Sequence, residues 1–162
     1  MRLIQKYPEL EAVIEMKESR KPMVIPKGIR KVVFVSANPA DRHLLQVAVE
    51  ELAIKLEFVF LKSAEEFQTQ LEEGRIVIGT HDILFVDYFL PRKSGLELLQ
   101  ILREDERFAQ LPILMMVPAM FDKILIGSYQ EGANCCILMP VDYYELITTL
   151  KGVLGYWNYM LR

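Results

Sequence analysis

Residues 82–95 read DILFVDYFLPRKSG, and the rest of the chain is organised around this stretch. A short run of bulky apolar residues that is ended by Pro91 and Gly95 is typical of a buried parallel strand rather than a helix. The run delivers a single carboxylate, Asp87, to the point where the chain must turn. Groups at the carboxyl ends of parallel strands line the crevice in which such sheets bind ligands. Asp87 is therefore either a reactive group or a turn residue, and its position alone leaves both interpretations open.

Strand-like and helix-like patterns alternate five times in the chain around this stretch. Asn38 as a cap, Pro39 in the first turn and Asp41 close behind predict the start of the first helix. Residues 75–81 fit either an extension of a helix or a short strand. The predicted strands are 32–35, 56–61, 82–87, 111–117 and 134–138, and the predicted helices begin at residues 39, 64, 94, 121 and 142. Right-handed crossovers then give a three-layer, doubly wound, flavodoxin-like α/β domain. Its five-stranded parallel sheet has the order 2-1-3-4-5, with a crevice between strands one and three.

Residues 1–29 are predicted to be an N-terminal extension, and residues 30–162 to be the α/β domain. Leu10, Val13 and Ile14 have helical spacing, and residues 21–28 have the prolines and glycine of a linker. Residues 1–31 carry a charge of +4, whereas the whole chain carries −3, so the remainder is acidic. Because the extension mixes both signs, packing on the body or on a second subunit is favoured over nucleic-acid binding.

Composition excludes several classes of protein. With 52% hydrophobic and 25% charged residues, the sequence is typical of a soluble globular domain. No apolar run is long enough to span a bilayer, and the first residues lack an export signal, so we expect a cytoplasmic protein with no membrane contact. The adjacent Cys135 and Cys136 and the two histidines offer no metal-ligand spacing. The sequence also lacks a glycine-rich phosphate loop and a nucleophile elbow, and we expect no enzyme activity.

Four blocks in order make the chain from about residue 30 to 162 resemble the receiver domain of two-component response regulators. The blocks are VSANPAD at 35–41, DILFVDYFLPRKSG at 82–95, LPILMMV at 111–117 and GANCCILMPV at 132–141. The long last helix with Tyr156-Trp157 is similar to the single-domain subgroup associated with phytochrome-type kinases. The resemblance implies a phosphorelay signalling protein, and no output domain is expected after the last helix.

Active receivers accept a phosphoryl group on the aspartate that ends strand three, which is Asp87 here. The resemblance also implies an acid pair that holds Mg²⁺, a hydroxyl residue, a lysine before a proline and a switch aromatic. Their positions are occupied by Ser36 and Ala37, by Val117, by Met139 and by Cys136, respectively. Of these functional groups, only the aspartate is retained.

These departures predict a vestigial phosphoacceptor in a degenerate pocket. Mg²⁺ prefers an oxygen-rich site, and phosphoryl transfer depends on charge stabilisation by the metal and a cation. We therefore expect no cofactor, and Mg²⁺ binding that is weak or absent. Burial beside Val117 and Met139 is expected to raise the pKa of Asp87. Asp41 and Asp82 are poor substitutes as metal ligands, because Asp41 faces helix capping and Asp82 begins its strand at the opposite end of the sheet.

The leading hypothesis is a receiver-like module that binds a sensor kinase or another signalling protein without being phosphorylated. In ordinary receivers the face of helix four, strand five and helix five forms dimers or meets targets, and here it is rich in aromatic residues. A homodimer through this face is expected, with Ile126, Tyr129, Tyr144, Tyr156, Trp157, Tyr159 and Met160 at the interface. The alternatives are a working phosphoacceptor at Asp87, a small-molecule sensor that uses the apolar crevice, and nucleic-acid binding through the N-terminal extension.

Overall fold

Five parallel strands form the middle layer of the structure, a computed structural model that describes residues 28–52, 54–119, 121–140 and 142–160. The strands are β1 (Lys31–Val35), β2 (Glu57–Leu61), β3 (Asp82–Asp87), β4 (Ile113–Val117) and β5 (Cys135–Leu138). Their order in the sheet is β2-β1-β3-β4-β5, which confirms the order predicted from the sequence. All four pairings are parallel, so every carboxyl end lies at the same edge.

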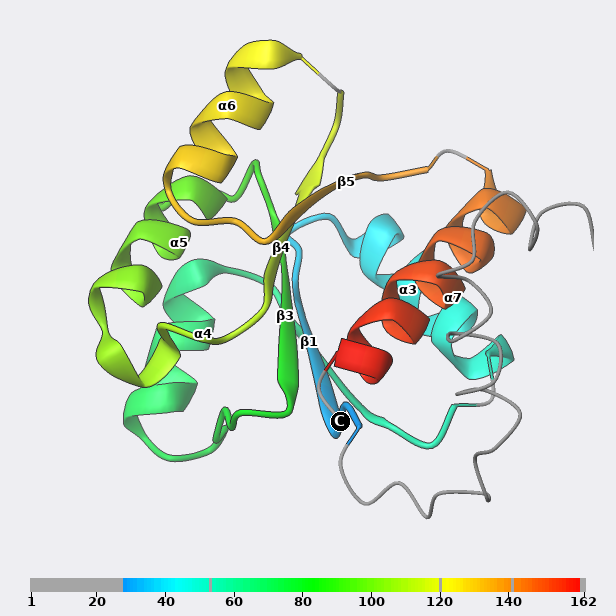
Figure 1. The fold of residues 1–162 in the computed structure, drawn as a ribbon, viewed down its shortest axis with the longest axis horizontal. Coiled ribbons are helices and arrows are strands. Elements are labelled where there is room, and N and C mark those ends of the chain that lie inside the picture. The colour runs from blue at the N-terminus through cyan, green and yellow to red at the C-terminus, as the bar shows by residue number, and fades with distance from the viewer. Residues whose placement is uncertain (1–27, 53, 120, 141, 161–162) are drawn as a thin grey trace, which may run out of the picture.

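Helices cover both faces of the sheet (Figure 1). Helices α3 and α7 lie together on one face, and α4, α5 and α6 lie on the other. The bounds are α3 (Pro39–Glu51), α4 (Ala64–Glu72), α5 (Gly95–Glu104), α6 (Asp122–Gln130) and α7 (Tyr143–Met160), with a short 3₁₀ helix at Glu106–Phe108. The predicted helix at residues 10–14 and almost all of the linker lie outside the described residues. None of the described helices is long and apolar enough to cross a membrane.

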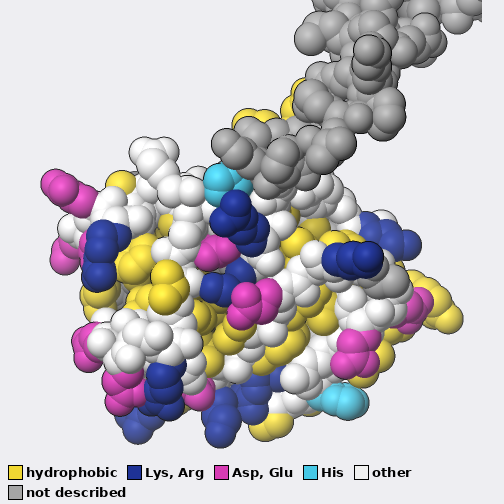
Figure 2. All heavy atoms as spheres, turned by 90° about the horizontal axis from the view of Figure 1, so that it is seen from below, with side chains coloured by type: hydrophobic (Ala, Val, Ile, Leu, Met, Phe, Trp, Pro, Cys, Tyr) yellow, Lys and Arg dark blue, Asp and Glu magenta, His cyan; other side chains and the backbone are white. Residues whose placement is uncertain are grey.

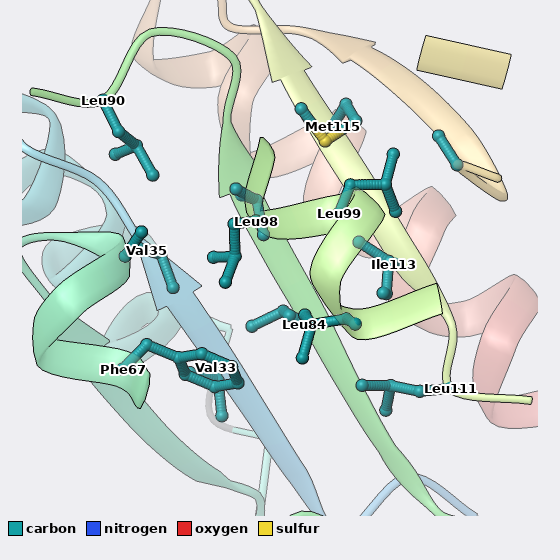
Figure 3. Packing of buried hydrophobic residues seen from close by; sticks show 14 of the residues in the cluster. Val33, Val35, Phe67, Leu84, Leu90, Leu98, Leu99, Leu111, Ile113 and Met115 are labelled. Carbon is teal, nitrogen blue, oxygen red and sulfur yellow. The ribbon is translucent and has the colours of Figure 1, made fainter. Parts of the chain in front are cut away.

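The alternation of side chains along each strand feeds two separate cores. In β1, Val33 and Val35 face the α4 and α5 side, whereas Val32 and Phe34 face α3 and α7. Figure 3 shows the first core, in which Phe67 of α4 packs among the side chains of β1, β3 and α5. Because both faces are covered, strand β3 is buried from Asp82 to Val86, as its continuous apolar run predicts.

Local capping explains where the helices begin. Asn38 Oδ1 accepts a hydrogen bond from the Ala40 N–H at 2.9 Å, so Asn38 caps α3. Ser94 and Glu97 form a reciprocal capping box at the start of α5, with distances of 3.2 and 2.7 Å. Both starts agree with the sequence analysis.

The ambiguous residues 75–81 form neither a helix nor a strand. Gly74 has a φ of +67°, a left-handed conformation that ends the helical path after α4. Ile76 is buried in the core, Ile78 is partly buried against it and Val77 is exposed, so residues 76–78 are an irregular connection anchored by two side chains. Strand β4 is also shorter than predicted and begins at Ile113 rather than residue 111. Pro112 still provides a carbonyl that accepts the Leu84 N–H at 3.0 Å.

The turn from β3 into α5 depends on a glycine. A Cβ placed on Gly95 would lie 1.9 Å from the backbone oxygen of Asp87 and 3.1 Å from Met115 Cε. The Gly95 N–H also donates to the Tyr88 carbonyl at 3.1 Å, so the start of α5 is held against the end of β3. Only glycine permits this approach, which fixes the backbone that carries Asp87.

Replacement of this glycine is therefore expected to destabilise the protein. Gly95→Ala should lower the free energy of unfolding by about 2 kcal/mol or more, because a close-packed backbone must move. The matched variant Gly152→Ala lies in α7 with open space around its Cβ, and should raise stability by about 0.5–1 kcal/mol. Urea denaturation of the two variants measures both effects, and equal effects would contradict the close approach at Gly95.

Candidate functional site

A hollow of about 490 Å³ lies at the carboxyl edge of the sheet, where the predicted crevice was expected. It brings together four of the predicted site residues, namely Ala37, Asp87, Val117 and Met139. These residues come from the ends of four strands or the loops that follow them. The hollow is mostly apolar, and its carboxylates come from Asp87 and Asp41.

Pairing on both sides of β3 sets the position of Asp87. Val86 lies in register with Val35 of β1, and Asp87 lies in register with Met116 of β4. The next residue continues the ladder, because the Tyr88 N–H donates to the Met116 carbonyl at 2.8 Å. The carboxylate therefore emerges at the central strand's end, half-buried between its two neighbours.

Ser36 is fully buried beside the hollow rather than lining it. Its N–H donates to the Leu61 carbonyl at 2.9 Å, and its carbonyl accepts from Arg42 Nη1 at 2.6 Å. Its hydroxyl lies near enough to Asp87 to lower the pKa of that carboxyl, yet Oγ has no hydrogen-bond partner of ordinary geometry. Ser36 therefore holds its hydroxyl next to Asp87, behind the lining of the hollow.

Cys136, at the predicted switch position, does not line the hollow. Its side chain is buried in the core on the α4 and α5 side of the sheet. Its backbone N–H donates to the Tyr129 hydroxyl oxygen at 3.1 Å, which joins β5 to α6. The residue at the switch position is therefore a small buried core residue.

Burial raises the pKa of Asp87 from its ordinary value of 3.8 to about 6. The nearby Ser36 hydroxyl and the Arg42 guanidinium lower the pKa, whereas the Asp41 carboxylate raises it. Desolvation is the largest of these effects, so the uncharged form of Asp87 is favoured relative to a solvated aspartate. The shift has the direction and the main cause expected from the sequence.

Asp41 lies in the first turn of α3, as the sequence predicted. Asn38 provides the cap of α3, and Asp41 also lines the hollow, which the sequence did not predict. The expectation for Asp82 is confirmed, because it lies at the opposite end of β3. There its Oδ2 accepts the Gly79 N–H at 2.6 Å and lies 3.8 Å from Lys31 Nζ.

Two aromatic residues at the rim were not identified from the sequence. Tyr88 and Phe89 line the hollow, with ring centroids 5.1 Å apart and planes at 84°. The Phe89 side chain is 67% exposed, which is unusual for a large apolar residue beside a cavity. The available signal was two aromatic residues directly after Asp87, in a turn where small polar residues are more common.

The predicted interface residues lie on α6 and α7, the two helices that flank strand β5 (Figure 1). Six of the seven are exposed, namely Ile126, Tyr129, Tyr144, Tyr156, Tyr159 and Met160. Trp157 is half-buried against the α3 and α7 core, so only part of its side chain is accessible. Leu138 is also exposed at the end of β5, and a second hollow of about 400 Å³ lies between it and Tyr144.

The titration of Asp87 is a direct test of the geometry of the hollow. Carboxyl ¹³C shifts in an NMR titration should give an Asp87 pKa of about 6. Asp41→Asn should lower this pKa by removing a negative charge, and Arg42→Gln should raise it by removing a positive one. A pKa at or below 4 in the unsubstituted protein would show that the carboxylate is solvated.

The same shift makes folding stability depend on pH. Because the folded pKa lies above the ordinary value, protonation stabilises the folded state, and this contribution is lost as pH rises from about 4 to 6. The loss should be of the order of 2 kcal/mol. Asp87→Asn should lack this component when unfolding is measured across the same pH range. An unchanged pH profile in the variant would contradict the assignment to Asp87.

Known proteins similar to this chain are response regulators, although no family model matches it. The chain is 34% identical over 110 residues to the chemotaxis protein CheY of Pseudomonas aeruginosa, a match that covers 68% of this chain and 84% of that protein. It is 32% identical over 105 residues to the phosphate regulon regulatory protein PhoB of the same organism, which covers 65% of this chain. The match spans only 46% of PhoB, so it concerns one part of that protein.

Solved structures agree with this assignment at the level of fold. The phosphorylated cyanobacterial phytochrome response regulator RcpA superposes with a TM-score of 0.73 at 22% identity. This similarity covers 83% of this chain and 97% of that structure. Together with the identity to CheY, the strand order and the aspartate that ends β3, it establishes the family. The chain belongs to the response regulator receiver domains of two-component signalling.

Proposed function

We propose that this receiver domain signals by binding other proteins and that phosphorylation of Asp87 is not required. The observation that carries the proposal is the composition of the hollow around Asp87. Ala37, Val117 and Met139 surround it where the family resemblance implies an acid, a hydroxyl and a lysine. Each replacement removes a polar group that would contact Mg²⁺ or the transferred phosphoryl group.

The groups that remain provide fewer ligands for Mg²⁺ than the family resemblance implies. This ion prefers octahedral coordination by oxygen atoms, commonly with one or two carboxylates. The hollow offers the carboxylates of Asp41 and Asp87 among carbon and sulfur atoms. The raised pKa of Asp87 favours its protonated form, which has no negative charge to attract a cation. Within the described residues, no three His, Cys, Asp or Glu side chains gather into a metal-binding group. We therefore propose that Mg²⁺ binds weakly or not at all.

Loss of the nucleophile is not the reason for the proposed inactivity. With a pKa of about 6, the Asp87 carboxylate is mostly ionised at neutral pH. Phosphoryl transfer is accelerated mainly by positioning and by stabilising the charge on the phosphoryl oxygens. This hollow provides neither a lysine nor a hydroxyl for that purpose, since these positions are Met139 and Val117. The rate of transfer, rather than the availability of the carboxylate, is what the replacements reduce.

A phosphodonor assay tests this proposal. The full chain should show no phosphoryl adduct by intact mass after incubation with acetyl phosphate and excess Mg²⁺. A receiver that has the acid pair and the lysine should show one under the same conditions. An adduct on this chain that disappears in Asp87→Asn would overturn the proposal and identify a working phosphoacceptor.

The face of α6, β5 and α7 is the proposed output surface. Exposed aromatic residues and Met are enriched in interface cores, and large exposed apolar groups mark binding sites. This face carries Tyr144, which is 76% exposed, and Ile126. We propose a sensor kinase or another signalling protein as the partner, a homodimer through the same face, and no enzyme activity of the domain itself.

The described surface gives less support to nucleic-acid binding. Figure 2 shows Lys and Arg side chains interspersed with Asp, Glu and apolar side chains on the face seen from below. The hollow at the amino ends of the strands is likewise lined by both signs, including Arg30, Lys31, Glu57 and Asp82. A nucleic-acid interface usually presents a continuous basic patch.

Substitution at the proposed output face tests the homodimer. The double variant Ile126→Ser/Tyr144→Ser should weaken dimerisation by at least about tenfold in sedimentation velocity. Val77→Ser is the matched control, because Val77 is 70% exposed but lies in the connection before β3. A monomeric unsubstituted protein at all concentrations, or an equal loss in the control, would contradict the dimer interface.

A further inference from the structure

The hollow at the end of β3 combines negative charge with apolar and aromatic walls. Asp41 and Asp87 provide the charge, whereas Val117, Pro118 and Met139 provide carbon and sulfur surfaces. Within the described residues, neither carboxylate forms an ion pair with a lysine or arginine. Arg42 is close enough to lower the Asp87 pKa, but it does not line the hollow. The charge that faces the open space is therefore negative.

Ser36 and Arg42 lie beside the two carboxylates but do not line the hollow. The Ser36 side chain is fully buried and its Oγ has no partner of ordinary geometry, although it lies near the Asp87 carboxyl. Arg42 is occupied with the Ser36 carbonyl at 2.6 Å. Asp41 and Asp87 line the hollow, so their carboxylate oxygens are the acceptors that a donor entering the hollow can reach. The hollow is thus a site that accepts hydrogen bonds and positive charge.

The walls select the kind of cation. Small divalent ions and ammonium groups are strongly hydrated, and carbon and sulfur surfaces do not replace their water. A guanidinium group is planar and weakly hydrated, donates to carboxylates in pairs, and stacks on aromatic rings. Phe89 presents an exposed ring at the rim, with Tyr88 edge-on beside it. The acidic groups and the rim together match a guanidinium group better than a metal ion.

We propose that this hollow binds the guanidinium group of an arginine side chain presented by a partner protein. This proposal rests on the proposed function, in which the domain works by binding proteins. Asp87 and Asp41 would accept the guanidinium N–H groups, and Phe89 would cover its face. The volume of about 490 Å³ and the opening at the carboxyl edge of the sheet allow a side chain to enter without moving the sheet.

The proposal is tested by NMR titration of the ¹⁵N-labelled full chain with three capped tripeptides. The peptides are acetyl-Gly-Arg-Gly-amide, its citrulline analogue, which is neutral and nearly isosteric, and its lysine analogue. The arginine peptide should bind and shift the amide signals of residues 37–41 and 87–89. Both analogues should bind at least about tenfold more weakly. Equal binding of the citrulline or lysine peptide, or no binding of the arginine peptide, would overturn the proposal.

Variants locate the binding site. Asp87→Asn and Asp41→Asn should each weaken binding of the arginine peptide by about tenfold. Glu57→Gln removes the same charge at the opposite end of the sheet, where β2 begins, and should leave the affinity unchanged. If Asp87→Asn does not fold, the comparison of Asp41→Asn with Glu57→Gln still tests whether the peptide binds in this hollow. Equal losses in all three variants would show that the peptide senses net charge and not this hollow.

A fourth ligand distinguishes a partner protein from a small guanidinium compound. Butylguanidinium should bind more weakly than the arginine peptide, because it lacks the backbone that would contact the rim. Equal or tighter binding of butylguanidinium would overturn the assignment to a protein partner. The phosphodonor assay is independent of these titrations. A phosphoryl adduct on Asp87 together with arginine binding would contradict the proposed function but support the arginine site. No adduct and no arginine binding would contradict the arginine site alone.

Discussion

The burial of strand β3 is the constraint on which the rest of this domain depends. It is paired on both edges and covered on both faces, with the Phe85 ring 4.8 Å from that of Phe34 on one side. The chain reaches solvent again at Asp87, so a carboxylate stands where the sheet stops excluding water. The return into α5 must start against that same backbone, which Gly95 alone allows. Fold and site are therefore set by the same few residues.

Burial and charge compete at this position, and burial is the larger effect. The Ser36 hydroxyl and Arg42 both favour the ionised form of Asp87, yet desolvation with the help of Asp41 raises its pKa to about 6. An active receiver resolves such a conflict with a metal ion and a lysine, as the family resemblance implies. Here Ala37 and Met139 stand at those positions, and the charged residues that line the hollow are Asp41 and Asp87. A domain of this kind can keep the family's fold while its chemistry changes.

Periodicity and turn chemistry were sufficient to predict the strand order, the five helices and their caps at Asn38 and Ser94. They failed where a local signal had two interpretations. Ile76 and the partly buried Ile78 anchor the segment after α4, and the apolar residues 76–78 indicated regular structure that Gly74 prevents. Asp41 was correctly placed in the first turn of α3, but its part in the hollow was not predicted. Its direction into the hollow, like the exposure of Phe89, depends on how the loops pack against each other, which a pattern along one chain does not record.

The switch position shows how the hollow and the output face are connected. In the family an aromatic residue in the fifth strand reports the state of the crevice, whereas Cys136 is small and buried. Its backbone N–H is held by Tyr129, whose side chain is at the exposed face of α6. The Met139 N–H donates to the Val117 carbonyl at 3.1 Å, so two residues of the hollow are joined where β5 pairs with β4. In place of the family's switch aromatic, position 136 contacts α6 through its backbone N–H. The hollow and α6 are therefore connected through the backbone of β5 and the Tyr129 hydroxyl, and also along the chain from Val117 and Pro118 into α6.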